Sequence, residues 1–548
     1  MANVKFNRIE FEKSIKITPE VVEKINLFGT PVESLSEREI EIEIYPNRPD
    51  LLSMQGFLRA IKSCLGNSKK TSYEVKKPLP NYEVTISPSV KNIRPFTSCA
   101  IVKNLKLTEE KIINIIDLQE KLHSTLGRNR KKVAIGVYPL EKIKLPIRYE
   151  ARKPEEINFI PLDSDKKMNV IDILKKHPKG KEFAHLLKGF DKFPVFLDSD
   201  SKVLSVPPII NSADTGKITE STKDVFIECS GSNLESLKKS LNIVVTTLAD
   251  MGGEIYQMNL KYDDKTIKTP DLSWQKIKLS IENTNKLLGL NLKEKDVFSL
   301  LSKMGIEYRS GVALVPPWRS DILHEVDLIE DIAIAYGYNN FIPEIPKVAT
   351  IGAEAPTEKI KNKIADLLVG LGYNEISTYH LIKEREAHLF GLDKKIEVEN
   401  SKTEYKILRP NLLIPALRIL SENKDKDYPQ NIFEIGTTFQ SDKEGIKETD
   451  IYESEKLIIV TSPGNFTKAK QILNYLFDSI DIKYSVSQSV KRNLIEGRTS
   501  TIVFDDVEIG YFGEIHPEAL RAWSIKMPCC VIEISLDKII EKIIEKYS

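Results

Sequence analysis

The sequence has few of the features that mark membrane, disulfide-rich or zinc-binding proteins. It contains five cysteines in 548 residues, and apart from the neighbours Cys529 and Cys530 they are scattered, without a C-x-x-C pair. We therefore expect neither a disulfide framework nor a zinc site, which is typical of a protein in a reducing cytoplasm. No apolar run approaches the length that spans a membrane, and the N-terminus lacks the pattern of a secretory signal.

A strong excess of charge of one sign is also missing. The formal net charge is +1, although 29% of the residues are charged. Any contact with nucleic acid must therefore come from local basic clusters and not from a global positive field. The hydrophobic content of 41% is ordinary for a soluble protein. A chain of this length is expected to form about three to five domains.

Segments of helical and strand-like pattern alternate along the whole chain. The predicted fold class is therefore α+β (mixed α/β) and multidomain. In the first module Glu39–Tyr45 alternates strictly, as in a half-buried strand, and Asp50 is a good N-cap for the helix that follows. We place the predicted modules at residues 1–84, 85–266, 267–346 and 347–548.

The second module contains several segments with unusual polar residues. The basic run Lys121–Lys132 leads into a predicted strand, Val133–Tyr138. Val203–Ser212 is an extended apolar run with a polar end, and Val225–Gly231 is a buried-looking strand that carries one acid, Glu228. An acid in such a run is costly to bury unless it has a partner or a function.

The most distinctive segment is a Pro-Pro turn followed by a helix whose first turns are acidic. Asp327, Glu330 and Asp331 are spaced i, i+3 and i+4, so they share one helix face, and Asp321 can fold back over that face. Four carboxylates in one volume repel each other unless a cation lies between them, and oxygen ligands suit magnesium. Alternatively, the acids complement the helix dipole and Asp321 is a cap. Both interpretations remain open at this point.

Four blocks of the sequence occur in a definite order. They are Pro46–Ser53, His123–Tyr138, Pro316–Tyr338, and Phe433–Gly436 together with Gly513–Pro517. Taken together, these blocks resemble the beta subunit of phenylalanine–tRNA ligase in its archaeal and eukaryotic form, over nearly the whole chain. The bacterial form has an inserted tRNA-binding-like fold and a C-terminal anticodon-binding domain, and neither has room here.

The resemblance implies an α2β2 enzyme that attaches phenylalanine to tRNA(Phe) with ATP as a substrate. The alpha subunit would hold the aminoacylation site. The modules would then be an N-terminal α/β module, an editing module of the B3/B4 type, a small magnesium-bearing helical or winged module, and a degenerate class II synthetase-like domain with an antiparallel sheet and helices. An active class II site needs an arginine just before its motif-two acid, but here Phe433 precedes Glu434. We therefore expect residues 347–548 to be a non-catalytic partner of the alpha subunit.

By the same resemblance, the acidic segment would bind magnesium near the contact with the alpha subunit. Asp321, Asp327, Glu330 and Asp331 match the family's ligand positions one for one. The ion would be structural more than catalytic, because the ATP site belongs to the other chain.

The family also removes tyrosine from wrongly charged tRNA. Tyrosine exceeds phenylalanine by one hydroxyl, which a pocket for the smaller ring rejects only about a hundredfold, so a second, hydrolytic site is expected in the large module. There we predict Leu204 as an apolar wall, Ser212 and Ser230 as groups that orient the substrate, and Glu228 as an acceptor for the tyrosine hydroxyl. The alternative is that these are core-strand residues with satisfied polar tips.

The basic run offers a further prediction. Arg128 and Arg130 are candidates for contact with tRNA phosphates, although such runs are usually solvated faces. His123 is more consistent with packing or a tRNA-backbone contact than with a general base. Two other functions stay open: a non-catalytic scaffold that binds tRNA and the alpha subunit without editing, and a free-standing tRNA deacylase. By the resemblance, the family has Asp and Thr near the positions of Glu228 and Ser230. This departure from the family pattern is the reason why the scaffold interpretation stays open.

Overall fold

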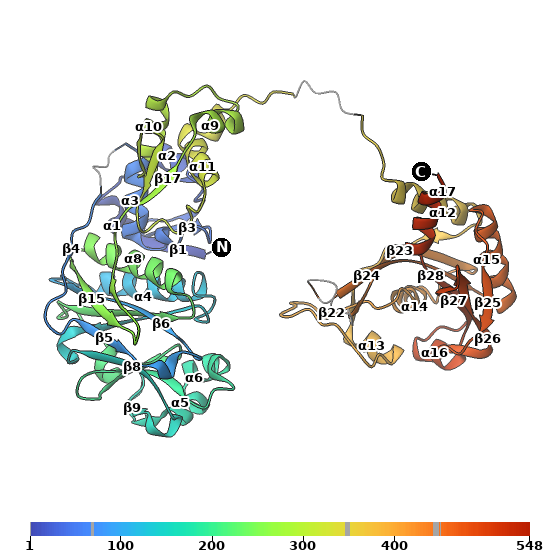
Figure 1. The fold of residues 1–548 in the computed structure, drawn as a ribbon, viewed down its shortest axis with the longest axis horizontal. Coiled ribbons are helices and arrows are strands. Elements are labelled where there is room, and N and C mark those ends of the chain that lie inside the picture. The colour runs from blue at the N-terminus through green and yellow to red at the C-terminus, as the bar shows by residue number, and fades with distance from the viewer. Residues whose placement is uncertain (1, 67–70, 346–350, 442–448, 450, 548) are drawn as a thin grey trace. The chain divides into compact units, whose positions relative to one another are not determined.

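The computed structural model describes residues 2–66, 71–345, 351–441, 449 and 451–547. The chain divides into two compact units, residues 1–345 and 346–548 (Figure 1). The predicted module boundary between residues 346 and 347 lies outside the described residues.

Unit 1 begins with a small antiparallel sheet in the order β1-β3-β2. The strand predicted from strict alternation is confirmed as β3, which buries its isoleucines and turns its glutamates outward. The predicted helix cap at Asp50 is wrong: Ser53 caps the helix by accepting the Gly56 N–H, whereas Asp50 pairs with Arg48. The elements are β1 (Ala2–Asn7), α1 (Arg8–Glu12), α2 (Pro19–Leu27), β2 (Val32–Leu35), β3 (Glu39–Ile44), η1 (Pro49–Leu51) and α3 (Met54–Cys64).

An 11-stranded sheet forms the largest part of unit 1. Its path is β13-β12-β11-β8-β5-β15-β6-β14-β7, with β4 and β16 paired to β15. The two strands predicted around the basic run and Glu228 are confirmed as β7 and β14. The strands are β4 (Val75–Lys76), β5 (Glu83–Ile86), β6 (Phe96–Lys103), β7 (Val133–Pro139), β8 (Ile147–Arg152), β11 (Phe193–Leu197), β12 (Val203–Val206), β13 (Ile210–Asn211), β14 (Val225–Gly231), β15 (Glu254–Lys261) and β16 (Thr266–Thr269).

The two faces of this sheet pack differently. Helices α4 (Glu109–Ser124) and α8 (Leu234–Asp250) cover one face of β6, β14 and β7 (Figure 1). On the other face the sheet folds over itself, so that aromatic residues of β7 and β14 meet those of β8 and β11 in one core. Short elements complete the module: η2 (Pro88–Val90), η3 (Leu140–Lys142), η4 (Pro154–Glu156), β9 (Asn158–Phe159), β10 (Met168–Asn169), α5 (Val170–Lys176), α6 (Pro178–Phe183), η5 (Ala184–Leu187) and α7 (Ala213–Gly216).

The last part of unit 1 is a small sheet, in the order β17-β19-β18, with helices. The acidic segment forms α11, as its spacing predicts. The elements are β17 (Gln275–Lys278), α9 (Ile281–Leu288), α10 (Glu294–Lys303), β18 (Glu307–Arg309), β19 (Val312–Val315), α11 (Glu325–Tyr336) and η6 (Tyr338–Asn340).

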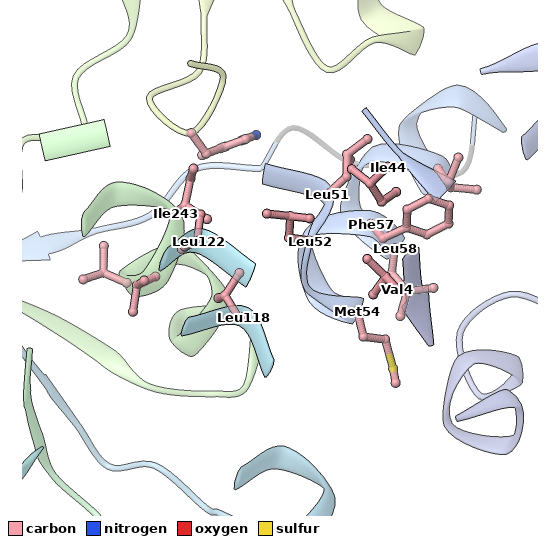
Figure 2. Close-up of a cluster of buried hydrophobic side chains, with 14 of the residues drawn as sticks. Val4, Ile44, Leu51, Leu52, Met54, Phe57, Leu58, Leu118, Leu122 and Ile243 are labelled. Atoms are coloured by element: carbon pink, nitrogen blue, oxygen red, sulfur yellow. The ribbon is translucent and has the colours of Figure 1, made fainter. Parts of the chain in front are cut away.

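One hydrophobic core runs through all three parts of unit 1. It joins the N-terminal sheet, the helical side of the large sheet and the acidic helix. Figure 2 shows Phe57 and Val4 of the N-terminal part in this cluster, with Leu118, Leu122 and Ile243 of the helices that cover the large sheet. The predicted modules of this unit therefore share their apolar interior.

Unit 2 is built on a seven-stranded sheet in the order β20-β23-β24-β28-β27-β26-β25, in which only the β20–β23 pair is parallel among the described strands. Helices α12, α15 and α17 pack on one face and α13, α14 and α16 on the other (Figure 1). The elements are α12 (Pro356–Gly370), β20 (Asn374–Glu375), β21 (Leu381–Lys383), α13 (Glu384–Phe390), β22 (Tyr405–Leu408), α14 (Leu413–Glu422), β23 (Gln430–Ser441), β24 (Ile451–Ser462), α15 (Phe466–Ser479), β25 (Ser485–Gln488), β26 (Leu494–Phe504), β27 (Val507–Ile515), α16 (Pro517–Ala522), β28 (Cys530–Ser535) and α17 (Asp537–Tyr547).

The predicted fold class, α+β and multidomain, is confirmed by these mixed sheets and helices. Within the described ranges, the structure contains no helix that is both long enough and apolar enough to cross a membrane.

The shared core leads to a stability prediction. Phe57 is fully buried where the N-terminal sheet meets the core, so Phe57→Ala should lower the free energy of unfolding by about 3–5 kcal/mol. Denaturant titration of the purified protein measures this loss. Ile9→Ala is the matched control, because Ile9 is 66% exposed, and surface changes cost about 0.5 kcal/mol or less. Equal losses in the two variants would contradict this placement of the core.

Candidate functional site

The acid of β14 lies inside unit 1, between the two halves of the large sheet. Glu228 is 2% exposed and pairs in register with Gly136 of β7. A side chain at Gly136 would collide with the Tyr138 ring, and so glycine is required for the tyrosine to lie over this position. The Tyr138 hydroxyl donates to Glu228 Oε1 at 3.2 Å and also lies 3.2 Å from Asn211 Oδ1. The second carboxyl oxygen, Oε2, has no hydrogen-bond partner in the described structure.

Glu228 lines a cavity of about 710 Å³ at the free edge of β7. One wall consists of isoleucines of α4, and the opposite wall is the segment from Pro207 to Asn211. His123, Glu120 and Arg130 lie at the polar side of the same cavity. A volume of this size is in the range of small-molecule sites, and its apolar walls with a few polar groups are typical of them.

Burial changes the protonation of this acid. It raises the pKa of Glu228 to about 8, against the opposing effects of the Arg94 charge and the hydrogen bond from Tyr138. At pH 7 the carboxyl group is therefore mainly neutral. A neutral carboxyl group can donate one hydrogen bond and accept others, so Glu228 is suited to bind a hydroxyl group in an apolar pocket.

The other residues predicted for this pocket lie near Glu228, but they do not line the cavity in the described structure. Ser230, two positions along β14, accepts a hydrogen bond from Arg94 Nε at 3.2 Å. Ser212 is buried, and its backbone N–H donates to the Leu204 carbonyl at 2.8 Å. Leu204 belongs to the core between the sheet halves. Their roles in substrate binding stay predictions.

The two arginines of the basic run have different environments. Arg128 is exposed, whereas Arg130 is buried, donating to the Ile209 carbonyl at 2.9 Å and pairing with Glu120 at 2.9 Å. Arg130 thus ties the basic loop to the segment on the other side of the cavity. Of the two, Arg128 is the one that lies open to a phosphate.

His123 has a structural contact at each ring nitrogen. Its Nε2 accepts the backbone N–H of Ile135, at the free edge of β7, at 2.8 Å. Its Nδ1 lies 3.3 Å from Glu120. Burial lowers the pKa of His123 below its ordinary value, which favours the neutral ring that this arrangement needs. The packing interpretation fits these contacts better than a general base does.

The acidic segment of the third module is arranged around an arginine. Arg319 is 4% exposed and donates to both oxygens of Asp321, at 2.9 and 2.7 Å. The same guanidinium lies 2.8 Å from Asp331. Two of the four predicted metal ligands are therefore neutralised by a side chain of this protein.

The other two acids have separate partners. Asp327 accepts the backbone N–H groups of Leu323 and His324 at 2.7 and 2.8 Å, as the third residue of α11 in a capping box whose N-cap is His324. Glu330 is exposed and accepts the Tyr338 hydroxyl at 2.8 Å. In the described parts of the chain, no group of three or more acidic, His or Cys side chains is gathered to hold a metal. In this arrangement two of the four carboxylates share Arg319, the other two have separate partners, and the four do not meet at one point. Magnesium binding stays a prediction.

Three residues that the sequence patterns do not single out organise these sites. Tyr138 and Arg94 contact the Glu228 strand from distant parts of the chain, and Arg319 stands between the acids. Arg319 could have been recognised, because it lies two residues before Asp321 and a buried acid requires a partner. The contacts of Arg94 and Tyr138 depend on sheet register, which the sequence alone does not reveal.

In unit 2, the acid that follows Phe433 is locked into an internal network. Glu434 is 3% exposed, and its carboxylate receives hydrogen bonds from Arg409 Nη1 at 2.7 Å and Thr378 Oγ1 at 2.7 Å. Arg409 is itself 1% exposed. On the same sheet face, Glu533 accepts from Tyr511 and from the backbone N–H of Leu412, next to α14. These charges are satisfied inside the unit.

Comparison with known families and proteins gives consistent similarities over the chain. Residues 80–245 match the B3/4 domain, residues 277–338 the tRNA synthetase B5 domain, and residues 342–536 the phenylalanyl tRNA synthetase beta chain CLM domain. The phenylalanine–tRNA ligase beta subunit of Thermococcus sibiricus is 38% identical over 501 residues, covering 89% of each chain. That of Archaeoglobus fulgidus is 35% identical over 529 residues, covering 94% of each.

A solved structure is also similar to this chain. It is an N-terminal fragment of the phenylalanyl-tRNA synthetase beta subunit from Pyrococcus horikoshii, 37% identical, with a TM-score of 0.59. The match covers 61% of this chain and 99% of the fragment.

The raised pKa of Glu228 predicts how stability depends on pH. The folded protein keeps this proton up to about pH 8, whereas the unfolded chain releases it near 4.5. The stabilisation is therefore complete below pH 4.5 and is lost as the pH rises through 8. Between pH 5 and 8, the free energy of unfolding should fall by on the order of 3 kcal/mol more in the wild type than in Glu228→Gln. Denaturant titrations at both pH values measure the difference, and parallel curves for the two proteins would refute the assignment.

Proposed function

This chain belongs to the family of phenylalanine–tRNA ligase beta subunits, and on that premise we propose that it performs two tasks. With an alpha subunit, in an α2β2 complex, it charges tRNA(Phe) with phenylalanine at the expense of ATP. In its large module it hydrolyses tRNA(Phe) that has been wrongly charged with tyrosine. We place this complex in the cytoplasm, which the unpaired state of the five cysteines supports.

The observation that carries the editing proposal is the unsatisfied carboxyl oxygen of Glu228 beside an apolar cavity. A bound tyrosine ring would bring a hydroxyl group to Oε2, which otherwise lacks a partner. Phenylalanine would leave that buried oxygen unpaired, which costs about 1–3 kcal/mol. Sites that recognise a hydroxyl in this way discriminate strongly against the ring that lacks it. The pocket is therefore suited to accept tyrosine and to reject the correct amino acid.

The reaction needs a water molecule at the ester carbonyl. Attack by water breaks the bond between the carbonyl carbon and the ribose oxygen, and this oxygen leaves with a proton. Glu228 is largely protonated and both nitrogens of His123 are engaged, so neither is the base. Glu228 acts by binding and orienting the side chain of the substrate.

We propose that unit 2 does not activate an amino acid. Phe433 stands where an active class II site has an arginine. The neighbouring Glu434 is held by Arg409, and Glu533 by Tyr511, so the charges on this sheet face are used to hold α14 and its neighbours in place. The aminoacylation site is accordingly assigned to the alpha subunit.

Two other functions have different structural requirements. A scaffold that binds tRNA and the alpha subunit without editing needs the same fold but no hydrolysis. A free-standing deacylase needs no alpha subunit. The cavity at Glu228 favours editing over the scaffold, and unit 2, with its match to the beta chain CLM domain, favours a subunit over a free-standing enzyme.

Hydrolysis of tyrosyl-tRNA(Phe) by the purified α2β2 complex tests the editing proposal. Glu228→Ala should lower the hydrolysis rate by about 10- to 100-fold, because it removes the hydrogen bond that holds the phenol. Ser212→Ala should also lower it, if this residue orients the substrate as the sequence resemblance implies. Phenylalanylation should not change in either variant. Glu141→Ala is the control, an exposed acid of the same module.

Each alternative has its own outcome in this assay. Unchanged hydrolysis in both pocket variants would favour the scaffold or place the site elsewhere. Full hydrolysis by the chain purified without an alpha subunit would favour the free-standing deacylase.

We also propose that magnesium binds at α11, as the resemblance implies, with Asp321, Asp327, Glu330 and Asp331 as the ligands. The proposal requires Asp327 to release the backbone N–H groups that it caps, and Glu330 to turn away from Tyr338. Glu330 is exposed and Asp327 half-buried, so these side chains are accessible from the surface. Burial raises the pKa of Asp331, so a cation added beside Arg319 would favour its charged form.

The magnesium proposal predicts the behaviour of Asp327→Ala. The variant complex should retain less magnesium after dialysis, measured by elemental analysis, and should assemble less well with the alpha subunit in size-exclusion chromatography. If Asp327 serves only in the capping box of α11, its loss should cost about 0.5–2 kcal/mol of stability and leave magnesium and assembly unchanged. Glu282→Ala is the control, because Glu282 is an exposed acid in the first turn of α9. A tightly held magnesium ion in Asp327→Ala would show that the ligand assignment is wrong.

A further inference from the structure

Arg94 is a buried arginine that no part of the proposed reaction has used. It follows η2 and precedes β6, and it is 6% exposed. Its guanidinium donates to both ends of one residue of β14: Nε to the Ser230 hydroxyl at 3.2 Å and Nη2 to the Ser230 carbonyl at 2.6 Å. It also donates to the Arg130 carbonyl at 3.2 Å and lies 3.4 Å from the Lys131 carbonyl. One side chain thus joins the Glu228 strand to the basic loop.

The basic loop needs such an anchor. Arg128, Asn129 and Arg130 are consecutive non-glycine residues with φ values of 49°, 51° and 65°. Left-handed residues of this kind persist only where their surroundings hold them. Backbone N–H groups of the loop donate back to the end of α4, as that of Arg130 does to the His123 carbonyl at 3.0 Å. The carbonyls of Arg130 and Lys131 turn the other way, toward Arg94.

The held loop shapes one end of the cavity. Arg130 lines it and reaches across to the Ile209 carbonyl, on the opposite wall. Arg128, on the same loop, is exposed and so lies outside this buried network. Arg94 does not line the cavity in the described structure, so it acts through the groups that it holds.

We propose that Arg94 is a positioning residue for the hydrolytic site, because it fixes the basic loop against β14 and places a positive charge beside Glu228. The inference rests on the proposed editing function. The assignment rests on the contacts of Arg94 with Ser230 and with the carbonyls of the basic loop.

The charge of Arg94 has an effect that packing alone would not produce. The groups whose charges act on Glu228 are Arg94, Tyr138 and Tyr149, with the thiols Cys99 and Cys229 on the neighbouring and the same strand. Glu120, His123, Arg130 and Lys179 line the same cavity as Glu228. Both tyrosines and both thiols have raised pKa values because of burial, so they are neutral near pH 7. Arg94 therefore supplies the positive charge that lowers the pKa of Glu228 against its burial.

The test compares two substitutions in the α2β2 complex, Arg94→Lys and Arg94→Gln. Lysine keeps the charge but lacks the fork that reaches Ser230 and the loop carbonyls at once. Both variants should hydrolyse tyrosyl-tRNA(Phe) about 10- to 100-fold more slowly at saturating enzyme, because the pocket groups are misplaced. Phenylalanylation should stay at the wild-type rate. Arg148→Gln is the control, since Arg148 lies on β8 of the same module and its side chain donates to the Ser201 hydroxyl at 2.7 Å.

The pH profile separates positioning from a merely structural role. Wild-type hydrolysis, corrected for the uncatalysed reaction, should fall as Glu228 ionises near pH 8. The midpoint of this fall, the pH at which half of the hydrolysis rate is lost, should move to higher pH in Arg94→Gln. In Arg94→Lys it should stay close to the wild-type value. Glu228→Gln should abolish the midpoint.

Every outcome bears on the inference. The inference is supported if both variants lose hydrolysis and only Arg94→Gln shifts the midpoint of the pH profile. Wild-type hydrolysis in both variants overturns it, and so does an equal loss with lowered melting temperatures and identical midpoints, which indicates a structural role. If the wild-type complex does not hydrolyse tyrosyl-tRNA(Phe), the proposed editing function is wrong. Failure of the Arg94 inference looks different, because it appears only in the variants while the wild type remains active.

Discussion

A charge removed from water must find a partner inside the protein, and this constraint applies to the buried charged side chains of both units. Arg319 is buried together with Asp321 and Asp331, and the pairing keeps the acidic helix against the rest of its module. Arg409 and Glu434 do the same under α14 in unit 2. Isolated buried ions would cost several kcal/mol each, so these pairs must form wherever the fold buries their members. They explain where charge is placed, although they do not by themselves make the fold stable.

Glu228 is the position where the constraint is left partly unmet. One of its oxygens accepts a hydrogen bond from a hydroxyl group and the other has no hydrogen-bond donor in the described structure. The guanidinium of Arg94, whose charge acts on Glu228, donates its hydrogen bonds to Ser230 and the basic loop. The carboxyl group therefore takes up a proton instead of keeping its charge. A buried polar group that lacks a partner, beside an apolar cavity, is ready to bind a ligand that supplies one. In the proposed editing reaction, the carboxyl group that weakens the fold at high pH is also the group that recognises the substrate, and Arg94 holds its strand against the basic loop.

The sequence was informative where structure depends on neighbours along the chain. Alternation of isoleucine and glutamate predicts β3, and the runs around Tyr138 and Glu228 predict β7 and β14. The spacing of Asp327 and Asp331 predicts a common helix, α11. The sequence did not reveal that Arg319 pairs with Asp321 and Asp331, because the direction of a side chain depends on rotamer choice and on its tertiary neighbours. Nor did it reveal that the modules of unit 1 share one core, since contacts between Phe57 and distant helices leave no local pattern.

The sequence by itself determined the family, the α+β class and the residue types available for chemistry, because these follow from local periodicity and from ordered blocks of residues. Only the tertiary structure decided which of those residues meet. The register of β14 against β7 puts Glu228 beside Tyr138, and the fold of the sheet brings Arg94 to Ser230 across more than a hundred residues of chain. Such contacts arise from packing and strand pairing between segments that are remote in sequence, and the protonation of Glu228 follows from burial, which exists only after the chain has folded.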